Sequence, residues 1–593
     1  MSEKKSTAKT DRAVDFLILK RIFTYVKPYR KSFYFAVSTT IILAAISPIR
    51  PYLIQYTFDN YITKSNISML FNMTILLIGL LIVETSIQFA DTYLTNSLGQ
   101  NIIKDLRVKL YKHVLNLRLK YYDRTPIGTL VTRAVSDIEV IADIFSQGLI
   151  VIMGDLLKLT VLFCVMLFTN YKLTLVSLIS IPLLLIATYL FKKAVSASFQ
   201  DVRTQIARLN AFVQEHITGM NIIQIFNREN AEFKKFDGIN AKHRDANIRS
   251  ILAYSIFFPV VEILSSVSLA LLVWYGGKGV LQQTATMGEL VAFIMYLNMM
   301  FRPIRQLADR FNSLQMGVIS SDRVFKVLDT HEIIENNGTI NANQTQGNIV
   351  FKNVWFAYKE EQWIIKNISF DVRSGETIAL VGATGAGKSS IINLLNRFYE
   401  YNKGEIMIDN NNLRAFELSS LRKNIGIVLQ DVFLFSDTLA NNISLNNPAI
   451  KIEQIIEAAK LVGAHDFISK LPNGYNYNAK ERGGMLSLGQ RQLISFIRAY
   501  VYNPKILILD EATSSVDTES EKLIQHAIDV ITMGRTSIII AHRLATIQKA
   551  DKIMVLDKGE IVEIGNHQQL LKQNGHYKRL FDLQFKEEKT ATE

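Results

Sequence analysis

Six long apolar stretches constrain this chain of 593 residues more than any other feature. They cover residues 33–56, 68–97, 140–169, 172–195, 251–281 and 285–315. Each exceeds the about 20 residues that a helix needs to cross the hydrocarbon core of a bilayer. Charged residues inside some of the stretches fit helices that extend beyond the lipid or line a water-filled space. The sequence therefore predicts six membrane-spanning helices and disfavours a soluble protein with six such core helices.

The distribution of basic residues supports this prediction and gives an orientation. The net charge is +13, but residues 348–593 hold 29 Lys and Arg against 28 Asp and Glu, so +12 belongs to the part with the apolar stretches. Basic residues gather in three segments, with nine in 1–31, eight in 104–133 and ten in 192–249. Because cytoplasmic loops of membrane proteins are rich in Lys and Arg, these segments and both termini are expected in the cytoplasm. The positive charge is thus attributed to membrane topology, and no nucleic-acid partner is expected.

The N-terminal segment and the cysteine content exclude two further classes. No apolar region follows a short basic start within residues 1–31, so this segment is interpreted as a cytoplasmic arm and not as a secretory signal. Cys164 is the single cysteine, which excludes an intrachain disulfide framework and a thiolate metal cluster.

A change of pattern near residue 330 predicts a second domain. Residues 329–347 are polar, rich in Asn and without helical periodicity, as is typical of a linker. Beyond them, β-type runs alternate with amphipathic helical stretches, as in α/β nucleotide-binding folds. The runs are IVFKNVWFAY, TIALVG, IGIVLQ, ILILDE, SIIIAHR and KIMVLDKG. The sequence predicts an all-α transmembrane domain at 32–328, an α/β domain at 348–585 and a tail at 586–593.

The clearest motif is an apolar run at 377–381 that leads into a glycine-rich loop and a helix, with the GxxxxGK[ST] spacing of a P-loop. The predicted phosphate-binding residues are Gly382, Ala383, Thr384, Gly385, Ala386, Gly387, Lys388, Ser389 and Ser390. The glycines let backbone N–H groups turn towards the phosphates. Lys388 supplies positive charge at the β- and γ-phosphates, and the Ser389 hydroxyl is a ligand for Mg²⁺. The motif predicts a nucleoside triphosphate site.

A second chemical element is the apolar run 506–509, which is followed by Asp510 and Glu511. Asp510 is placed at a strand end to hold Mg²⁺ through its water shell. Glu511 is placed to polarise an attacking water as a general base. An apolar run before two acids is a weak signal alone, and the P-loop upstream makes the combination specific for nucleotide hydrolysis.

Between these elements, the sequence Leu486-Ser-Leu-Gly-Gln490 resembles the LSGGQ signature of the ATP-binding cassette (ABC) family. The chain departs from the signature at Leu488, where the family has its first glycine. Ser487 and Gly489, which contact the γ-phosphate and let the backbone approach in the family, are present. The resemblance implies ATP and Mg²⁺ as cofactors, with Ser487, Gly489 and Gln490 acting on the ATP held by a second chain.

The resemblance also assigns roles to residues that mean little one by one. It implies that adenine stacks on Tyr358, that Gln430 and His542 belong to the catalytic centre, that Gln430 lies near Mg²⁺ and that Asp517 lies in the interface loop. Tyr358 alone fits an ordinary edge-strand aromatic, and His542 alone fits a polar residue at a strand end. The order and spacing of the whole set carry the assignment.

The complete chain is similar to exporter-type half-transporters of the ABC family, such as bacterial multidrug and lipid A exporters. This implies ATP-driven export or flipping of amphipathic substrates across the cytoplasmic membrane by alternating access, in a homodimer or in a heterodimer with a related half-transporter. It also implies coupling helices near residues 121–130 and 211–220. A dedicated lipid A or phospholipid flippase is an alternative. A remote alternative is an ABC ATPase acting on nucleic acid or ribosomes, which the six predicted spans oppose.

Charged residues inside the predicted spans are candidates for contact with the substrate. Asp155 and Lys158 are three residues apart on one helical face of the third span and are placed to pair with each other. Arg302 and Arg305 in the sixth span resemble the basic residues that meet lipid phosphates in lipid A flippases. Solvated or paired arginines at the cytoplasmic end of a long helix are the competing explanation.

Overall fold

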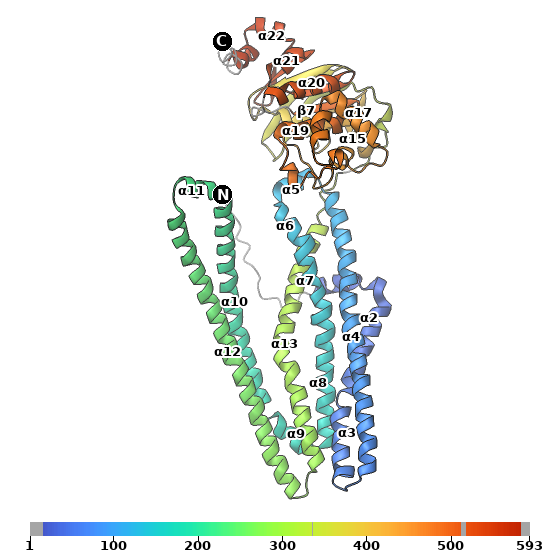
Figure 1. The fold of residues 1–593 in the computed structure, drawn as a ribbon, viewed down its shortest axis with the longest axis vertical. Coiled ribbons are helices and arrows are strands. Elements are labelled where there is room, and N and C mark those ends of the chain that lie inside the picture. Colours follow the sequence, from blue (N-terminus) through green and yellow to red (C-terminus); the bar gives the residue numbers. More distant parts are fainter. Residues whose placement is uncertain (1–15, 335, 511–517, 542, 583–593) are drawn as a thin grey trace. The chain divides into compact units, whose positions relative to one another are not determined.

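The computed structural model describes residues 16–334, 336–510, 518–541 and 543–582. These residues form two compact units (Figure 1). The first unit comprises the chain up to Leu115 together with Thr125–His331, and the second comprises Asn116–Arg124 together with the chain from Glu332 onward. The short segment Asn116–Arg124 therefore packs with a domain whose other residues come much later in the sequence.

The first unit is all-α in its described residues. Its helices are α1 (Phe16–Thr24), α2 (Arg30–Ile46), α3 (Ile49–Thr57), α4 (Ile67–Leu115), α6 (Ile127–Thr132), α7 (Ile138–Asp143), α8 (Leu149–Thr169), α9 (Tyr171–Leu178), α10 (Ile181–Thr218), α11 (Met220–Ile225), α12 (Glu229–Leu281) and α13 (Met287–Leu328). Short 3₁₀ or π segments at Lys27–Tyr29, Phe58–Ile62, Arg133–Asp137 and Ile144–Gly148 join several of them. In Figure 1, α10 and α12 lie side by side as a long hairpin that α11 closes.

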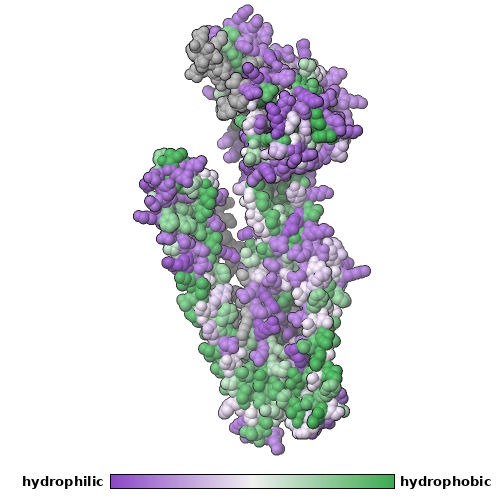
Figure 2. All heavy atoms as spheres, in the orientation of Figure 1, coloured by the Kyte–Doolittle hydropathy of each residue, from purple (hydrophilic) through white to green (hydrophobic). Residues whose placement is uncertain are grey.

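Among the described residues, five helical stretches are long and apolar enough to cross a membrane. They are Lys27–Ile62, Ile67–Leu115, Ile127–Thr169, Tyr171–Thr218 and Glu229–Leu281. They contain the first five predicted spans. The sixth lies in α13, which has 42 residues but carries Glu289 and Arg302 in its apolar part, so its hydropathy is lower. Figure 2 shows hydrophobic residues gathered over the lower part of the helical unit. Near the tip of the α10–α12 hairpin, hydrophilic residues predominate, with a hydrophobic group at the tip itself.

The two predicted coupling helices differ from the observed short helices in position. Residues 121–130 form the end of α5 (Leu119–Arg124) and the start of α6, because Pro126 separates them and disfavours a helical conformation in the residue before it. The prediction of a helix at 211–220 is wrong in its bounds, since α10 continues to Thr218. The short helix at this turn is α11, which begins after Gly219.

The second unit is an α/β domain with two sheets. The smaller sheet is antiparallel and has the order β2 (Trp363–Val372), β1 (Ile349–Ala357), β4 (Lys403–Ile408) and β5 (Asn411–Asn412). The larger has the order β10 (Glu560–Gly565), β9 (Lys552–Asp557), β3 (Thr377–Val381), β8 (Thr536–Ile540), β7 (Ile506–Asp510) and β6 (Ile425–Val428). All its pairs are parallel except β10–β9. β7 and β8 are mostly apolar and almost wholly buried, as expected for parallel strands covered on both faces.

The second unit also contains helices, several of which pack against the larger sheet. Besides α5, they are α14 (Lys388–Leu395), α15 (Leu418–Asn424), α16 (Leu439–Ser444), α17 (Ile452–Val462), α18 (His465–Lys470), α19 (Leu488–Val501), α20 (Thr518–Thr532), α21 (Leu544–Lys549) and α22 (His567–Gln573). One apolar core lies between the two sheets and α14, and another packs α17, α19 and α20 against the larger sheet. The predicted all-α domain followed by an α/β P-loop domain is confirmed.

Candidate functional site

The topology of the larger sheet gathers the predicted nucleotide-site residues at one edge. The P-loop follows β3, Asp510 ends β7, and Gln430 comes two residues after β6. The register pairs Ile540 of β8 with Leu380 of β3 on one side and with Asp510 on the other. Because these strands are parallel, their carboxyl ends meet at the same edge, where ligands bind in such sheets.

Three of the predicted residues cannot be placed at this edge. Glu511, Asp517 and His542 lie outside the described residues. Their roles as general base, interface residue and catalytic histidine stay predictions.

The P-loop conformation requires glycine at two positions. Gly387, at the start of α14, has a φ of +103°, and a Cβ there would lie 2.8 Å from Cδ1 of Ile365. A Cβ at Gly382 would lie 2.2 Å from the carbonyl oxygen of Leu556 in β9. Side chains would be strained at the first position and excluded at the second. The backbone can therefore wrap closely and present its N–H groups to an anion at the start of α14.

Lys388 is buried at the base of this loop, with 8% of its surface exposed. Its Nζ donates hydrogen bonds to the carbonyl oxygens of Gly382, at 2.6 Å, and Ala383, at 3.1 Å. Burial lowers the pKa of the Lys388 ammonium, and the nearby Asp510 carboxylate opposes this shift. Phosphate oxygens are stronger, charged acceptors than these carbonyls, so a nucleotide would stabilise the buried cation.

Tyr358 lies next to the P-loop helix. Its hydroxyl is 3.2 Å from the Ser390 hydroxyl and accepts a hydrogen bond from the Asn393 side chain at 3.1 Å. Its ring meets those of Phe356 and Tyr399 edge to face, with centroids 4.7 Å and 4.8 Å away. The structure thus brings the aromatic predicted to stack on adenine into contact with a residue predicted to bind phosphate.

The signature segment forms the N-terminus of α19. The Ser487 hydroxyl accepts a hydrogen bond from the Gln490 N–H at 3.2 Å, and the Gln490 side chain accepts one from the Ser487 N–H at 3.0 Å. This capping box closes the start of α19, where the helix dipole places partial positive charge. Leu488 is the first residue of α19 and adopts ordinary helical backbone. The position therefore has no conformational requirement for glycine.

Replacing this leucine with the family residue is expected to have a small effect. Leu488→Gly should keep ATPase activity within about threefold, equivalent to less than 1 kcal/mol of barrier, since the cap and Gly489 are unchanged. Ser487→Ala is the contrasting variant. It should lose about 1 kcal/mol of helix capping and, if Ser487 contacts the γ-phosphate, about 100-fold in turnover. Thermal unfolding and ATP hydrolysis measured on both variants would check this, and a large loss in Leu488→Gly would contradict it.

The first unit holds a charged cavity of about 530 Å³ among its predicted spans. Its charged lining residues are Arg50, Glu84, Asp91, Asp155, Lys158, Arg302 and Arg310, from α3, α4, α8 and α13. Polar residues of α4, among them Gln88 and Asn96, extend the lining. A polar cavity inside a membrane domain is a functional-site candidate, because charges facing lipid are costly.

The pairing of these charges differs from the prediction. Asp155 forms an ion pair with Arg310 of α13 and not with Lys158. Arg50 lies 3.7 Å from the Glu84 carboxylate. Within the described part of the chain, no carboxylate pairs with Lys158 or Arg302.

Two cavity carboxylates and one arginine were missed by sequence reasoning. Arg50, Glu84 and Asp91 lie inside the first two predicted apolar stretches, so a charge within a predicted span was the signal that could have found them. Asp91 accepts hydrogen bonds from the hydroxyls of Thr39, at 3.0 Å, and Thr40, at 2.7 Å. The backbone of Arg305 lies in α13, but its side chain is outside the described structure.

Comparison with known proteins finds ABC transporter families for both parts of the chain. Residues 33–304 match the family described as ABC transporter transmembrane region, and residues 365–514 match the family described as ABC transporter. The chain is similar to the uncharacterized ABC transporter ATP-binding protein YknV of Bacillus subtilis, with 38% identity over 95% of this chain and 94% of that protein. It is also similar to the putative multidrug export ATP-binding/permease protein YgaD of Bacillus subtilis, with 36% identity over 96% and 99%. The ATP-dependent lipid A-core flippase of Syntrophus aciditrophicus is 34% identical over 97% and 96%.

Proposed function

Because this chain belongs to the ABC transporter family, with a transmembrane region and an ATP-binding domain in one polypeptide, we propose that it exports amphipathic substrates at the expense of ATP. The observation that carries the proposal is the pairing of a P-loop, with its buried lysine, and a charged cavity among the predicted spans. Relatives named as a multidrug exporter and as a lipid A-core flippase support an amphipathic substrate.

The proposed nucleotide chemistry uses residues at the carboxyl edge of the larger sheet. Lys388 and the P-loop N–H groups would hold the phosphates, and Tyr358 the adenine. Ser389, Gln430 and Asp510 offer a hydroxyl, an amide and a carboxylate, and such oxygen donors fit Mg²⁺, with Asp510 acting through water. Mg²⁺ would neutralise charge on the phosphates while Glu511 and His542 orient the attacking water.

A homodimer is the proposed assembly. The signature at the start of α19 would act on ATP in the second copy, and two cassettes would then form two sites across a two-fold interface. Exposed apolar side chains at the tip of the α10–α12 hairpin support a partner. Ile222, Ile225 and Phe226 are 64%, 78% and 69% exposed, and soluble surfaces seldom present such a group.

The proposed cycle is alternating access. ATP binding would favour the closed pair of cassettes, and hydrolysis would release it, because each conformation is populated according to how tightly it binds nucleotide. The chain is a multi-pass membrane protein. Its distribution of basic residues supports the cytoplasmic membrane, with both termini and the cassette in the cytoplasm.

The experiment that tests the function is ATP hydrolysis by the purified chain in lipid nanodiscs, with a cationic amphipathic dye or lipopolysaccharide added. Stimulation by the dye, together with dye uptake into inside-out vesicles, would support a broad exporter. Stimulation by lipopolysaccharide alone would favour the dedicated flippase. Hydrolysis that neither amphiphile changes, in a chain that moves no dye, would contradict export.

Arg302 is the cavity residue with the clearest expected effect on substrate. Arg302→Gln should raise the half-maximal concentration of an anionic amphiphile in the stimulation assay by about tenfold, equivalent to about 1.4 kcal/mol, because the cavity loses a cation that has no carboxylate partner among the described side chains. Lys326→Gln is the matched control, since Lys326 lies on the same helix but pairs with Asp322 at 2.6 Å. Equal stimulation curves for Arg302→Gln and the unsubstituted chain would refute a substrate role for Arg302.

A further inference from the structure

The segment before α5 is joined to the linker of the second unit by backbone contacts. Leu117 and Ile333 form a β-bridge, and the Arg118 N–H donates to the Glu332 carbonyl at 2.8 Å. The Arg118 side chain also donates to the Ile333 carbonyl at 2.8 Å. These contacts fix where α5 begins on the cassette.

One side chain of the cassette holds α5 itself. The Tyr399 hydroxyl donates a hydrogen bond to the Asp123 carboxylate of α5. Tyr399 is 8% exposed, so this hydroxyl is the end of a buried ring that reaches the surface at Asp123. A charge-assisted bond from a buried donor is stronger than an ordinary surface contact.

The other side of the Tyr399 ring faces the nucleotide site. Its centroid lies 4.8 Å from that of Tyr358, with the rings at 87°, and 5.8 Å from that of Phe356. Arg118 and Lys120, which flank the start of α5, line the same pocket of about 120 Å³ as Tyr358 and Tyr399. One buried residue thus touches both the aromatic that we assign to adenine and the helix that we compare with a coupling helix.

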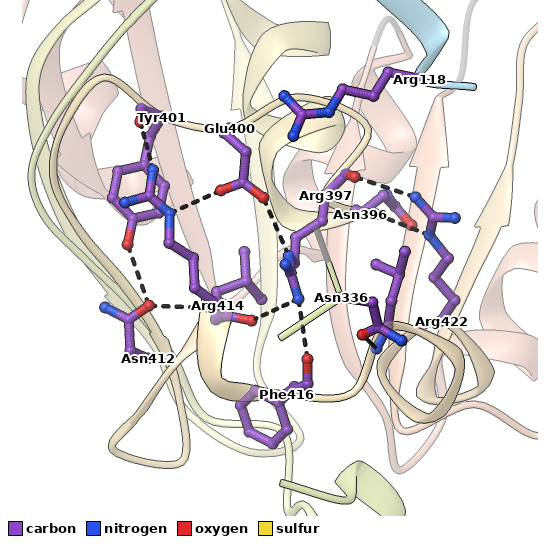
Figure 3. Close-up of polar contacts among 12 residues, drawn as sticks. Arg118, Asn336, Asn396, Arg397, Glu400, Tyr401, Asn412, Arg414, Phe416 and Arg422 are labelled. Carbon is purple, nitrogen blue, oxygen red and sulfur yellow. Dashed lines mark hydrogen bonds and ion pairs between the residues drawn. The ribbon is translucent and has the colours of Figure 1, made fainter. Parts of the chain in front are cut away.

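The backbone around Tyr399 is fixed by a network of arginines (Figure 3). Arg397 donates to the Phe416 carbonyl at 3.0 Å, and Arg422 donates to the Arg397 carbonyl at 3.1 Å. Glu400 lies between Arg397, at 3.4 Å, and Arg414, at 2.8 Å. Because the backbone is anchored on both sides of Tyr399, the Tyr399 ring has little freedom to relax when the Tyr358 ring moves. A displacement of the Tyr358 ring would therefore also displace the Tyr399 hydroxyl.

We propose that Tyr399 is a positioning residue that links the nucleotide base at Tyr358 to α5 within the same chain. The inference rests on the proposed function. Adenine stacking on Tyr358 would fix the Tyr358 and Tyr399 rings, and the Tyr399 hydroxyl would carry α5 with the cassette as it closes. The coupling segment then responds to the base as well as to the phosphates.

The test separates nucleotide binding from its effect on the membrane helices. Val108 of α4 is 62% exposed and can carry a nitroxide label as Val108→Cys in a Cys164→Ser background. Double electron–electron resonance would measure the distance between labels of the two copies in nanodiscs, with and without ATP and vanadate. A fluorescent ATP analogue would report the affinity of the same samples.

Tyr399→Phe keeps the ring and removes only the bond to α5. We expect its ATP affinity to stay within about twofold of the unsubstituted chain. In the variant, the population that has the shorter label-to-label distance with ATP and vanadate should fall by about fivefold or more at equal ATP saturation. Fivefold is the lower end of the usual coupling between sites. Asp123→Ala should have the same effect, and the two changes together should be no worse than either, since they break one contact. Asp123→Asn keeps an acceptor and should recover most of the shortening.

Tyr401→Phe is the matched control. Tyr401 is 6% exposed, lies two residues further on, and donates to the Asn412 side chain at 3.2 Å without touching α5. It should close like the unsubstituted chain. Normal closure of Tyr399→Phe, or an equal loss in Tyr401→Phe, would overturn the link through Tyr399. An unsubstituted chain with no label-to-label distance would overturn the proposed dimer and this inference with it.

Discussion

Glu511→Gln is expected to bind ATP as tightly as the unsubstituted chain and to hydrolyse it about 1,000-fold more slowly, within the usual range for loss of a general base. Glutamine has the size of glutamate but cannot take a proton from the attacking water. The neighbouring Asp510, at the end of β7, would still hold Mg²⁺ through water, so the ground-state complex should survive. Steady-state hydrolysis and equilibrium binding of a fluorescent ATP analogue would separate the two effects.

The control for this variant is an acid of the same domain outside the predicted site. Glu563→Gln is not suitable, because Glu563 accepts hydrogen bonds from the backbone of His576 and Tyr577. Glu453→Gln in the first turn of α17 is suitable, since its side chain is exposed. Hydrolysis by Glu511→Gln at the rate of Glu453→Gln would exclude Glu511 as the base.

Lys388→Ala is expected to lose at least about 100-fold in affinity for ATP, equivalent to about 2.7 kcal/mol. The variant removes the buried ammonium, which bonds two loop carbonyls in the unliganded structure and would bond the phosphates of ATP. Alanine would leave the phosphate charge uncompensated at this position. The unliganded cassette should not be destabilised, because removing Lys388 also removes the cost of burying it. Lys423→Ala, at an exposed position of α15, is the control.

Proton linkage gives a second check on Lys388. Burial lowers its pKa, so the unliganded lysine loses its proton at a lower pH than an ordinary lysine does. Phosphate binding favours the protonated form. Above neutral pH, ATP affinity should therefore fall as pH rises through the lowered pKa, and Lys388→Ala should lack this dependence. Unchanged ATP affinity of Lys388→Ala at neutral pH would refute the P-loop assignment.

Much of the cassette could be predicted from sequence, because its motifs follow buried parallel strands. The six β-type runs became β1, β3, β6, β7, β8 and β9. β2, β4, β5 and β10 were missed. β5 consists of two asparagines, and the other three mix charged and apolar residues, as in the alternating pattern of β10 from Glu560 to Gly565. Such strands depend on backbone pairing with a neighbour more than on their own apolar character.

Side-chain partners in the membrane unit could not be predicted in the same way. Asp155 and Lys158 share a helix, and spacing along one helix predicts only contacts within it. The actual partner of Asp155 is Arg310, which another helix supplies. The Tyr399–Asp123 contact could not be predicted for the same reason. The sequence pattern of one segment contains no information about which distant segment packs against it. Pairs distant in sequence become visible only when packing is known.

The division of the chain into units has a consequence for anyone who exchanges parts between transporters. Residues 116–124 belong to the same compact unit as the cassette, although in sequence they lie between two segments of the helical unit. A chimera joined once, near residue 331, would give the new cassette a foreign α5. A compatible graft must carry two pieces of donor sequence, and random recombination with a single crossover would mostly produce mismatched hybrids.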